Sequence, residues 1–209
     1  MRPKVAAKLR LRYEDFQTTH PHLVYCGAYG FRKEGPLADK PAYDDIIQAA
    51  SGLADVIGAV SDQPRYVPSI VADKISAYAV ATGVLSALFQ RSQTGQGQAV
   101  EIGMFECLVD FMMVEHLYGA TFEPPIDRMG YSRILNKERR PYATQDGYLA
   151  VLPYTDQNWR DFFKIAGKEE LLQDPRFASV SKRVENAQAL YGTVAQIVAT
   201  RSEEHTSEL

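Results

Sequence analysis

Asp73 is the residue whose place in the sequence most favours chemistry. It ends the segment Pro68-Ser-Ile-Val-Ala-Asp73, and no residue from Ile75 to Phe89 is charged. A helix over that uncharged run would bring its positive N-terminal end to the Asp73 carboxylate. The carboxylate then has two roles open to it. It can cap the helix by accepting free backbone N–H groups, or it can stay ionised as a nucleophile for covalent catalysis.

A second polar group, Tyr43-Asp-Asp-Ile-Ile-Gln48, lies at the start of another predicted helix, which should stop at Gly52. Acidic residues in a first turn suit the helix dipole. Together with Asp73, this is the one place where polar residues gather around an otherwise apolar framework. Helix capping at both places is the simpler interpretation, and a carboxylate site is the alternative.

The run that follows Asp73 is apolar almost all round, which predicts a helix buried in the core of a sizeable protein. Its uncharged stretch is too short to cross a bilayer. It also carries the small or polar residues Ser76, Thr82, Gly83 and Ser86. We therefore expect no membrane partner.

Strands and helices alternate along the first part of the chain. The predicted elements are a helix over residues 5–16, a strand over 22–27, a loop over 27–41, a connection over 58–68, the helix after Asp73, a strand over 99–102 and a helix over 104–118. This alternation predicts an α/β fold with parallel strands. Gly95 and Gly97 follow a helix and precede a strand, the reverse of the order in a phosphate-binding loop, so they predict a tight turn.

The domain organisation follows from shifts in composition. Residues 1–121 form a partial large domain, and residues 122–140, rich in Pro and Arg, form a linker. Residues 141–200 form a smaller α+β domain with a hairpin turn at Asp146-Gly147 and a final helix over 182–200. Residues 201–209 resemble a translated sequencing adapter, so we expect a non-native tail and a chain that is a fragment.

Bulk properties exclude several classes of function. The chain has 209 residues and a net charge of −3, which gives no electrostatic footprint for nucleic acid. Cys26 and Cys107 lack CxxC spacing and indicate reduced thiols in a cytoplasmic protein. The body histidines have neither triad nor metal-site spacing, so we expect no metal; they are His20, His22 and His116.

Six motifs follow one another along the chain. They are His20-Pro-His-Leu-Val-Tyr25, Gly30-Phe-Arg-Lys-Glu-Gly-Pro36, Tyr43-Asp-Asp-Ile-Ile-Gln-Ala-Ala-Ser-Gly52, Ala72-Asp-Lys74, Ala87-Leu-Phe-Gln-Arg-Ser-Gln-Thr-Gly-Gln-Gly-Gln98 and Arg140-Pro-Tyr-Ala-Thr-Gln-Asp-Gly-Tyr148. In this order they resemble the class III CoA-transferases, which include formyl-CoA transferase, carnitine CoA-transferase and the α-methylacyl-CoA racemases. The resemblance runs from Met1 to about Thr200. It implies that the large domain is Rossmann-like.

The resemblance implies a mechanism and partners. Asp73 occupies the place of the family's nucleophile, which carries CoA from an acyl-CoA to a carboxylic acid through an aspartyl-CoA thioester. CoA and acyl-CoA are then substrates, and no cofactor is bound permanently. Lys8 and Met104 stand where family members contact CoA. The full-length parent is expected to form an interlocked homodimer, and the fragment alone to have little or no activity.

Tyr43 bears on the reaction within the family. The racemases carry a histidine at the matching position, and a tyrosine with a pKa near 10 is a poor base at neutral pH. CoA transfer is therefore favoured over racemisation. Asp44 matches an acidic position beside the transferase site, which implies positioning or acid–base help. The alternatives are a racemase or epimerase of the same family and an inactive, truncated CoA-binding fragment.

Overall fold

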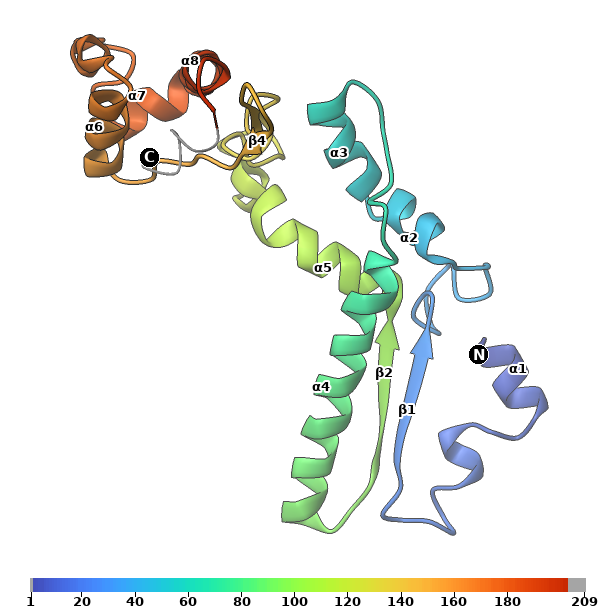
Figure 1. Ribbon diagram of the computed structural model, residues 1–209. Helices are drawn as coiled ribbons and strands as arrows, with labels where there is room; N and C mark the ends of the chain where they lie inside the picture. The colour runs from blue at the N-terminus through green and yellow to red at the C-terminus, as the bar shows by residue number, and fades with distance from the viewer. Residues whose placement is uncertain (1, 203–209) are drawn as a thin grey trace. The chain divides into compact units, whose positions relative to one another are not determined.

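A parallel pair of strands lies at the centre of the first part of the chain. The computed structural model describes residues 2–202. Strand β1 (Val24–Tyr29) pairs with β2 (Gln98–Gly103) in parallel, from Val24 opposite Gln98 to Tyr29 opposite Gly103. Parallel strands need a crossover connection, which the helices between them supply. The predicted α/β fold with parallel strands is confirmed (Figure 1).

The crossover runs through three helices, and a fourth follows β2. They are α2 (Asp44–Ala50), α3 (Leu53–Ser61), α4 (Val71–Thr94) and α5 (Met104–His116). Helix α4 packs against both strands and runs antiparallel to them, so its first turn lies near their carboxyl ends (Figure 1). Ligand sites in α/β sheets form at that end of the strands.

The turn from α4 into β2 has the predicted form. Gly95 ends the helix in the left-handed region, at a φ of 72°. A Cβ on Gly97 would overlap the backbone of Leu23, and the Gly97 N–H donates to the carbonyl of Pro21 at 2.7 Å. The Arg91 guanidinium donates to the carbonyl of His22. The Arg…Thr-Gly-x-Gly segment therefore anchors α4 to the start of β1.

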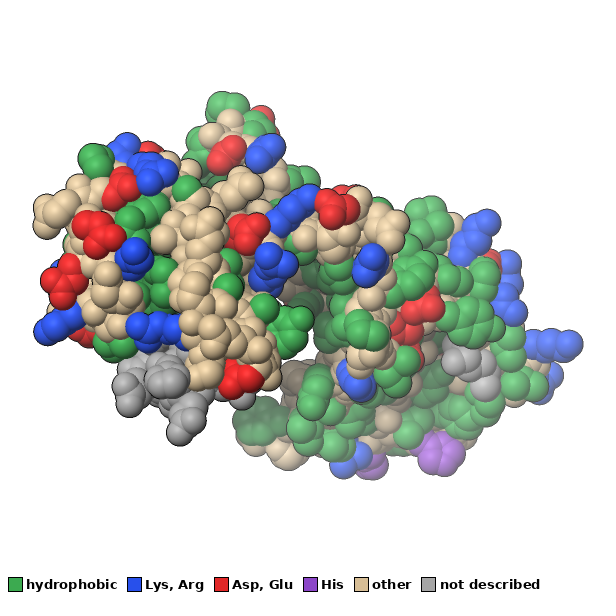
Figure 2. Space-filling view, turned by 45° about the horizontal axis from the view of Figure 1, so that its top comes forward, with side chains coloured by type: hydrophobic (Ala, Val, Ile, Leu, Met, Phe, Trp, Pro, Cys, Tyr) green, Lys and Arg blue, Asp and Glu red, His purple; other side chains and the backbone are tan. Residues whose placement is uncertain are grey.

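The prediction that the helix after Asp73 is buried on all sides is wrong for this chain. Only three of its residues are buried: Ala72, Ser76 and Ala87. The exposed fractions are 78% for Tyr78, 65% for Leu85 and 70% for Phe89. Two strands about 4.8 Å apart are narrower than a helix about 10 Å across, so the sheet covers one face only. Figure 2 shows hydrophobic side chains on the surface of the molecule.

Length and composition alone would allow α4 to cross a membrane, against the sequence-based expectation that the run is too short. The same criterion is met by core helices of soluble proteins. Here α4 packs on a parallel sheet and contacts α2 and α5, which is the position of a crossover helix in an α/β fold.

Two further predictions about this part were wrong. The helix expected over residues 5–16 is broken into α1 (Pro3–Lys8) and a 3₁₀ turn at Tyr13–Asp15. The chain reverses at Arg10, whose φ of 53° is incompatible with a continuous right-handed helix. The sequence analysis predicted no helix where α3 lies, and the end of α3 occupies part of the expected connection over 58–68.

One hydrophobic cluster joins three helices and the loop after β1. Its buried members are Phe31, Ile47, Ala72, Leu108 and Met112. They come from the loop after β1 and from α2, α4 and α5. Because α2, α4 and α5 all contribute residues, the cluster holds these three helices together.

The chain divides into two compact units after Gly130, inside the segment 122–140 that the sequence predicts as a linker. The second unit contains the antiparallel pair β3 (Tyr142–Ala143) and β4 (Tyr148–Leu149) around Asp146-Gly147. Its helices are α6 (Asp156–Ile165), α7 (Val180–Glu185) and α8 (Ala187–Ala199), with a 3₁₀ turn at Glu169–Gln173.

The core of the second unit is aromatic. Trp159, Phe162 and Phe163 of α6 pack on Val194 and Val198 of α8. The single helix predicted over 182–200 is wrong, because Asn186 breaks it into α7 and α8. Of the predicted non-native tail, residues 203–209 lie outside the described residues, and the tail stays a prediction.

Candidate active site

Asp73 is the third residue of α4, in its first turn. Its side chain is exposed. Within residues 2–202 the carboxylate has neither a hydrogen-bond partner nor an ion-pair partner. The interpretation of Asp73 as the cap of its own helix is therefore wrong, because its oxygens accept no backbone N–H.

Asp44 caps that turn instead. It is the first residue of α2 and only 8% exposed. Its Oδ2 atom accepts the backbone N–H of Asp73 at 3.0 Å. The N–H groups of a first turn have no partner within their own helix, and Ile70 at the N-cap has no polar side chain to offer. A carboxylate from a different helix thus satisfies the N–H of Asp73.

Gln48 completes the arrangement one turn further along α2. Its side chain is fully buried, and Nε2 donates to Oδ1 of Asp44 at 2.6 Å. Its Oε1 accepts the N–H of Val67 at 2.8 Å, and Nε2 also lies 3.3 Å from the carbonyl oxygen of Ser69. The amide therefore joins α2 to the segment that leads into α4.

The sequence analysis grouped Gln48 with the polar residues around Asp73 but gave it no role. The available signal was its spacing of four residues from Asp44, which places both side chains on one face of a helix. Nothing local in the sequence showed that the same amide would also bind the segment before α4. That contact depends on the tertiary fold.

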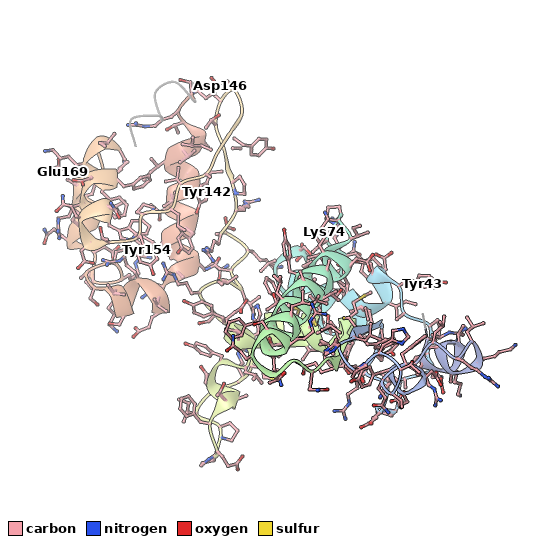
Figure 3. The ribbon with its side chains drawn as sticks, turned by 90° about the horizontal axis from the view of Figure 1, so that it is seen from below. Tyr43, Lys74, Tyr142, Asp146, Tyr154 and Glu169 are labelled. Carbon is pink, nitrogen blue, oxygen red and sulfur yellow. The ribbon has the colours of Figure 1, made fainter. Side chains whose placement is uncertain are left out.

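Tyr43 is at the N-cap position of α2 and is 73% exposed. Figure 3 shows it projecting away from the ribbon, while Lys74 marks the start of α4. The Lys74 ammonium donates to Oγ of Ser69 at 2.8 Å, so it also holds the segment before α4. No described contact joins the Tyr43 hydroxyl to Asp73.

The two residues predicted to contact CoA have different surroundings. Met104 is the first residue of α5, directly after β2, and packs against the cluster that contains Ala72. It therefore belongs to the same end of the sheet as Asp73. Lys8 is the exposed last residue of α1, and no described contact connects it to Asp73 or Asp44.

A pocket at the carboxyl end of β1 carries positive charge that the sequence analysis passed over. Arg2, Tyr29, Gly30, Phe31, Lys40 and Ala42 are among its lining residues. A Cβ on Gly30 would overlap that of Ala42, so glycine permits the close approach of this loop. Arg2 and Lys40 are the cationic residues among those that line this pocket.

Neither cysteine is set up as a nucleophile. Burial raises the pKa of the Cys26 thiol. Burial, with the nearby carboxylates of Glu106 and Asp110, raises the pKa of Cys107. Both thiols are therefore protonated at neutral pH, and a thiol is a much weaker nucleophile than a thiolate. In the described part of the chain, no three His, Cys, Asp or Glu side chains group as metal ligands.

The chain resembles proteins that transfer CoA. The family model "CoA-transferase family III" matches residues 1–209. The acetyl-CoA:oxalate CoA-transferase of Acetobacter aceti is 29% identical over 206 residues, covering 98% of this chain and 53% of that protein. The succinate–glutarate CoA-transferase of Agrobacterium fabrum is 28% identical over 197 residues, covering 94% of this chain and 48% of its own length.

A solved structure agrees with these relatives. A CaiB/BaiF family protein from Brucella suis superposes with a TM-score of 0.76 at 25% identity, covering 99% of this chain and 55% of that one. The chain thus spans about half the length of the relatives it matches. Since the family model extends over the whole sequence, the chain belongs to CoA-transferase family III.

Proposed function

We propose that this protein moves CoA from an acyl-CoA donor to a carboxylic acid acceptor, with Asp73 as the covalent nucleophile. The observation that carries the proposal is the Asp73 carboxylate itself. It lies in the first turn of α4, near the carboxyl ends of β1 and β2, and has no partner among the described residues. The helix N-terminus favours its ionised form, which is the form that attacks.

The reaction balances without any other reactant. The Asp73 carboxylate attacks the thioester carbonyl, and CoA thiolate leaves as an acyl-aspartyl anhydride forms. The thiolate attacks the aspartyl carbonyl, releasing the donor acid and forming the aspartyl-CoA thioester. The acceptor carboxylate attacks that thioester and expels CoA thiolate. The thiolate then takes the acceptor acyl group, and the Asp73 carboxylate is restored.

No step of this sequence moves a proton, because the attacking and leaving groups are carboxylates and thiolates throughout. The site therefore needs a free carboxylate and donors for the developing oxyanions more than it needs a general base. Position 43 carries an exposed tyrosine, and a phenol is a poor base for racemisation at neutral pH. This favours transfer over the racemase alternative.

CoA and acyl-CoA enter the proposal as substrates, with no permanently bound cofactor. Met104 and Lys8 are proposed CoA contacts, and Met104 has the better support because it packs beside the start of α4. One relative is named for acetyl-CoA and oxalate and another for succinate and glutarate, which supports a carboxylic acid as acceptor. A cytoplasmic homodimer is the form we propose for the active protein.

The test is to trap the aspartyl intermediate. The full-length parent, which is also used for every kinetic measurement below, is mixed with acetyl-CoA and oxalate, and then with succinyl-CoA and glutarate. The reaction is quenched with hydroxylamine and mapped by peptide mass spectrometry. We expect a hydroxamate on Asp73, lost in Asp73→Asn and kept in Asp45→Asn, which alters an exposed carboxylate in the first turn of α2. Normal turnover by Asp73→Asn would exclude the mechanism.

Two further outcomes separate the alternatives. Solvent deuterium entering the α-carbon of a branched acyl-CoA without any acceptor acid would identify a racemase. We also propose that the 209-residue chain alone transfers CoA slowly or not at all, because it spans about half the length of its relatives. Full-rate exchange by the isolated chain would contradict that statement.

A further inference from the structure

We propose that Gln48 and Asp44 are positioning residues for Asp73, and that neither exchanges a proton with substrate. Gln48 orients the Asp44 carboxylate, and Asp44 takes the N–H of Asp73, which leaves the Asp73 carboxylate uncapped for attack. This rests on the proposed function, since it assigns how the nucleophile of that reaction is held.

Gln48 has the properties of a fixed amide. It is 0% exposed, and both ends of its amide are used: Nε2 toward Asp44 and Oε1 toward Val67. A buried amide is costly to leave unpaired, so a rotation that broke one contact would break the others. The side chain therefore locks the distance between α2 and the residues that lead into α4.

Asp44 is committed through both of its oxygens. Oδ1 accepts from Gln48 at 2.6 Å and Oδ2 accepts from the N–H of Asp73 at 3.0 Å. Hydrogen bonds to a carboxylate are stronger than those between neutral groups. Both oxygens are engaged, the residue is only 8% exposed, and the proposed reaction moves no proton. Asp44 is therefore suited to holding the first turn of α4 in place and poorly suited to acid–base catalysis.

The consequence reaches Asp73 through its backbone. Ala72 beside it is fully buried, and Oγ of Ser76 donates to the carbonyl oxygens of Ala72 and Asp73. The turn is thus held from its buried side, and its N–H is held by Asp44. The direction of the Asp73 Cα–Cβ bond is fixed, while its carboxylate stays without a competing N–H donor.

A polarity swap tests this directly. In Asp44→Asn the new amide loses the charge-assisted bonds, and in Gln48→Glu two carboxylates face each other. The double variant Asp44→Asn/Gln48→Glu restores one donor and one acceptor between positions 44 and 48. It also keeps an acceptor for the N–H of Asp73 and another for that of Val67, and it gives up the longer contacts from position 48 to the carbonyls of Val67 and Ser69.

We expect each single variant to lower kcat about 10- to 100-fold with KM changed by less than about twofold, as a misplaced reacting group would. The double variant should regain most of kcat. Gln93→Glu, at an exposed position near the far end of α4, is the matched control and should keep normal kcat. Single variants with unchanged kcat would overturn the proposal.

A second outcome would also overturn it. If the double variant stays inactive while amide exchange at Asp73 is as slow as in the parent, then the Asp44 carboxylate itself acts on substrate. Failure of the proposed function is separate, since it shows as no hydroxamate on Asp73 in the parent. The positioning role is then decided by amide exchange, faster at Asp73 in both single variants and restored in the double variant.

Discussion

Oδ2 of Asp44 accepts the backbone N–H of Asp73 at 3.0 Å, so two residues 29 positions apart in the sequence join the first turns of α2 and α4. The bond is at once a helix cap and a link between the two carboxylates that the sequence had singled out. The two carboxylates therefore have different roles: that of Asp44 is engaged in hydrogen bonds between helices, and that of Asp73 is left free.

Loss of this cap should destabilise the first unit. Asp44→Ala leaves the N–H of Asp73 and the amide of Gln48 without their acceptor, so the free energy of unfolding should fall by about 2–3 kcal/mol. Asp45→Ala, at the exposed neighbouring position, should cost less than about 0.5 kcal/mol. Urea unfolding followed by far-UV circular dichroism measures both, and equal losses would refute the assignment.

The turn into β2 makes a prediction about its glycines. Gly97→Ala would force a Cβ into the backbone of Leu23, which should cost about 1–3 kcal/mol. Gly95→Ala, at a φ of 72° with open space around it, should cost about 1 kcal/mol from backbone strain alone.

Gly192→Ala is the control for that pair. It lies within α8 with open space at its Cβ position, so it should stabilise the protein by up to about 1 kcal/mol. Thermal unfolding of the three variants gives the order of their stabilities. A Gly97→Ala protein as stable as Gly192→Ala would contradict the close approach to Leu23.

Arg183 should matter to the second unit far more than its neighbour. Its buried guanidinium donates to the carbonyl of Phe177 at 2.9 Å and to the carboxylate of Asp156, at the start of α6. Arg183→Ala should lower the free energy of unfolding by about 1–3 kcal/mol. Lys182→Ala removes only an exposed ion pair and should change the free energy of unfolding by a few tenths of a kcal/mol.

The single tryptophan reports that loss selectively. Trp159 is 4% exposed in the core of the second unit, so its fluorescence follows this unit alone. Denaturant unfolding of both variants should be read by this signal. An Arg183→Ala midpoint equal to that of Lys182→Ala would exclude the structural role given to the guanidinium.

Alkaline pH should destabilise the second unit through Tyr142. Burial, and secondarily the neighbouring Tyr191, raises the pKa of Tyr142 to about 12. The unfolded value is near 10. A group with a raised pKa in the folded state contributes its full stability below the unfolded pKa. That contribution is therefore lost as the pH rises from about 10 to about 12.

The comparison of Tyr142→Phe with Tyr148→Phe isolates this effect. Tyr148 lies across the same hairpin but is 71% exposed. Stability measured by Trp159 fluorescence across this pH range should decline less steeply in Tyr142→Phe, and as steeply as in the parent in Tyr148→Phe. Parallel profiles for all three proteins would show that Tyr142 is not the titrating group.

Sequence patterns predicted some elements well and others poorly, for physical reasons. The parallel strands, α2, α4, α5 and the turn at Gly95 follow from local periodicity and from glycine's access to positive φ. The breaks at Arg10 and Asn186 lie within continuous helical patterns, where tertiary contacts override propensity. The exposure of α4 depends on how wide the sheet is, which no local pattern encodes.

The sequence by itself determined the family motifs and the α/β class, and it led to the prediction of Asp73 as nucleophile, because residue type and order carry those. Only the tertiary structure decided that Asp73 does not cap its own helix. That outcome depends on Asp44 and Gln48 of α2 reaching the first turn of α4. Such contacts follow from how helices pack on a shared core, which the order of residues along one helix does not reveal.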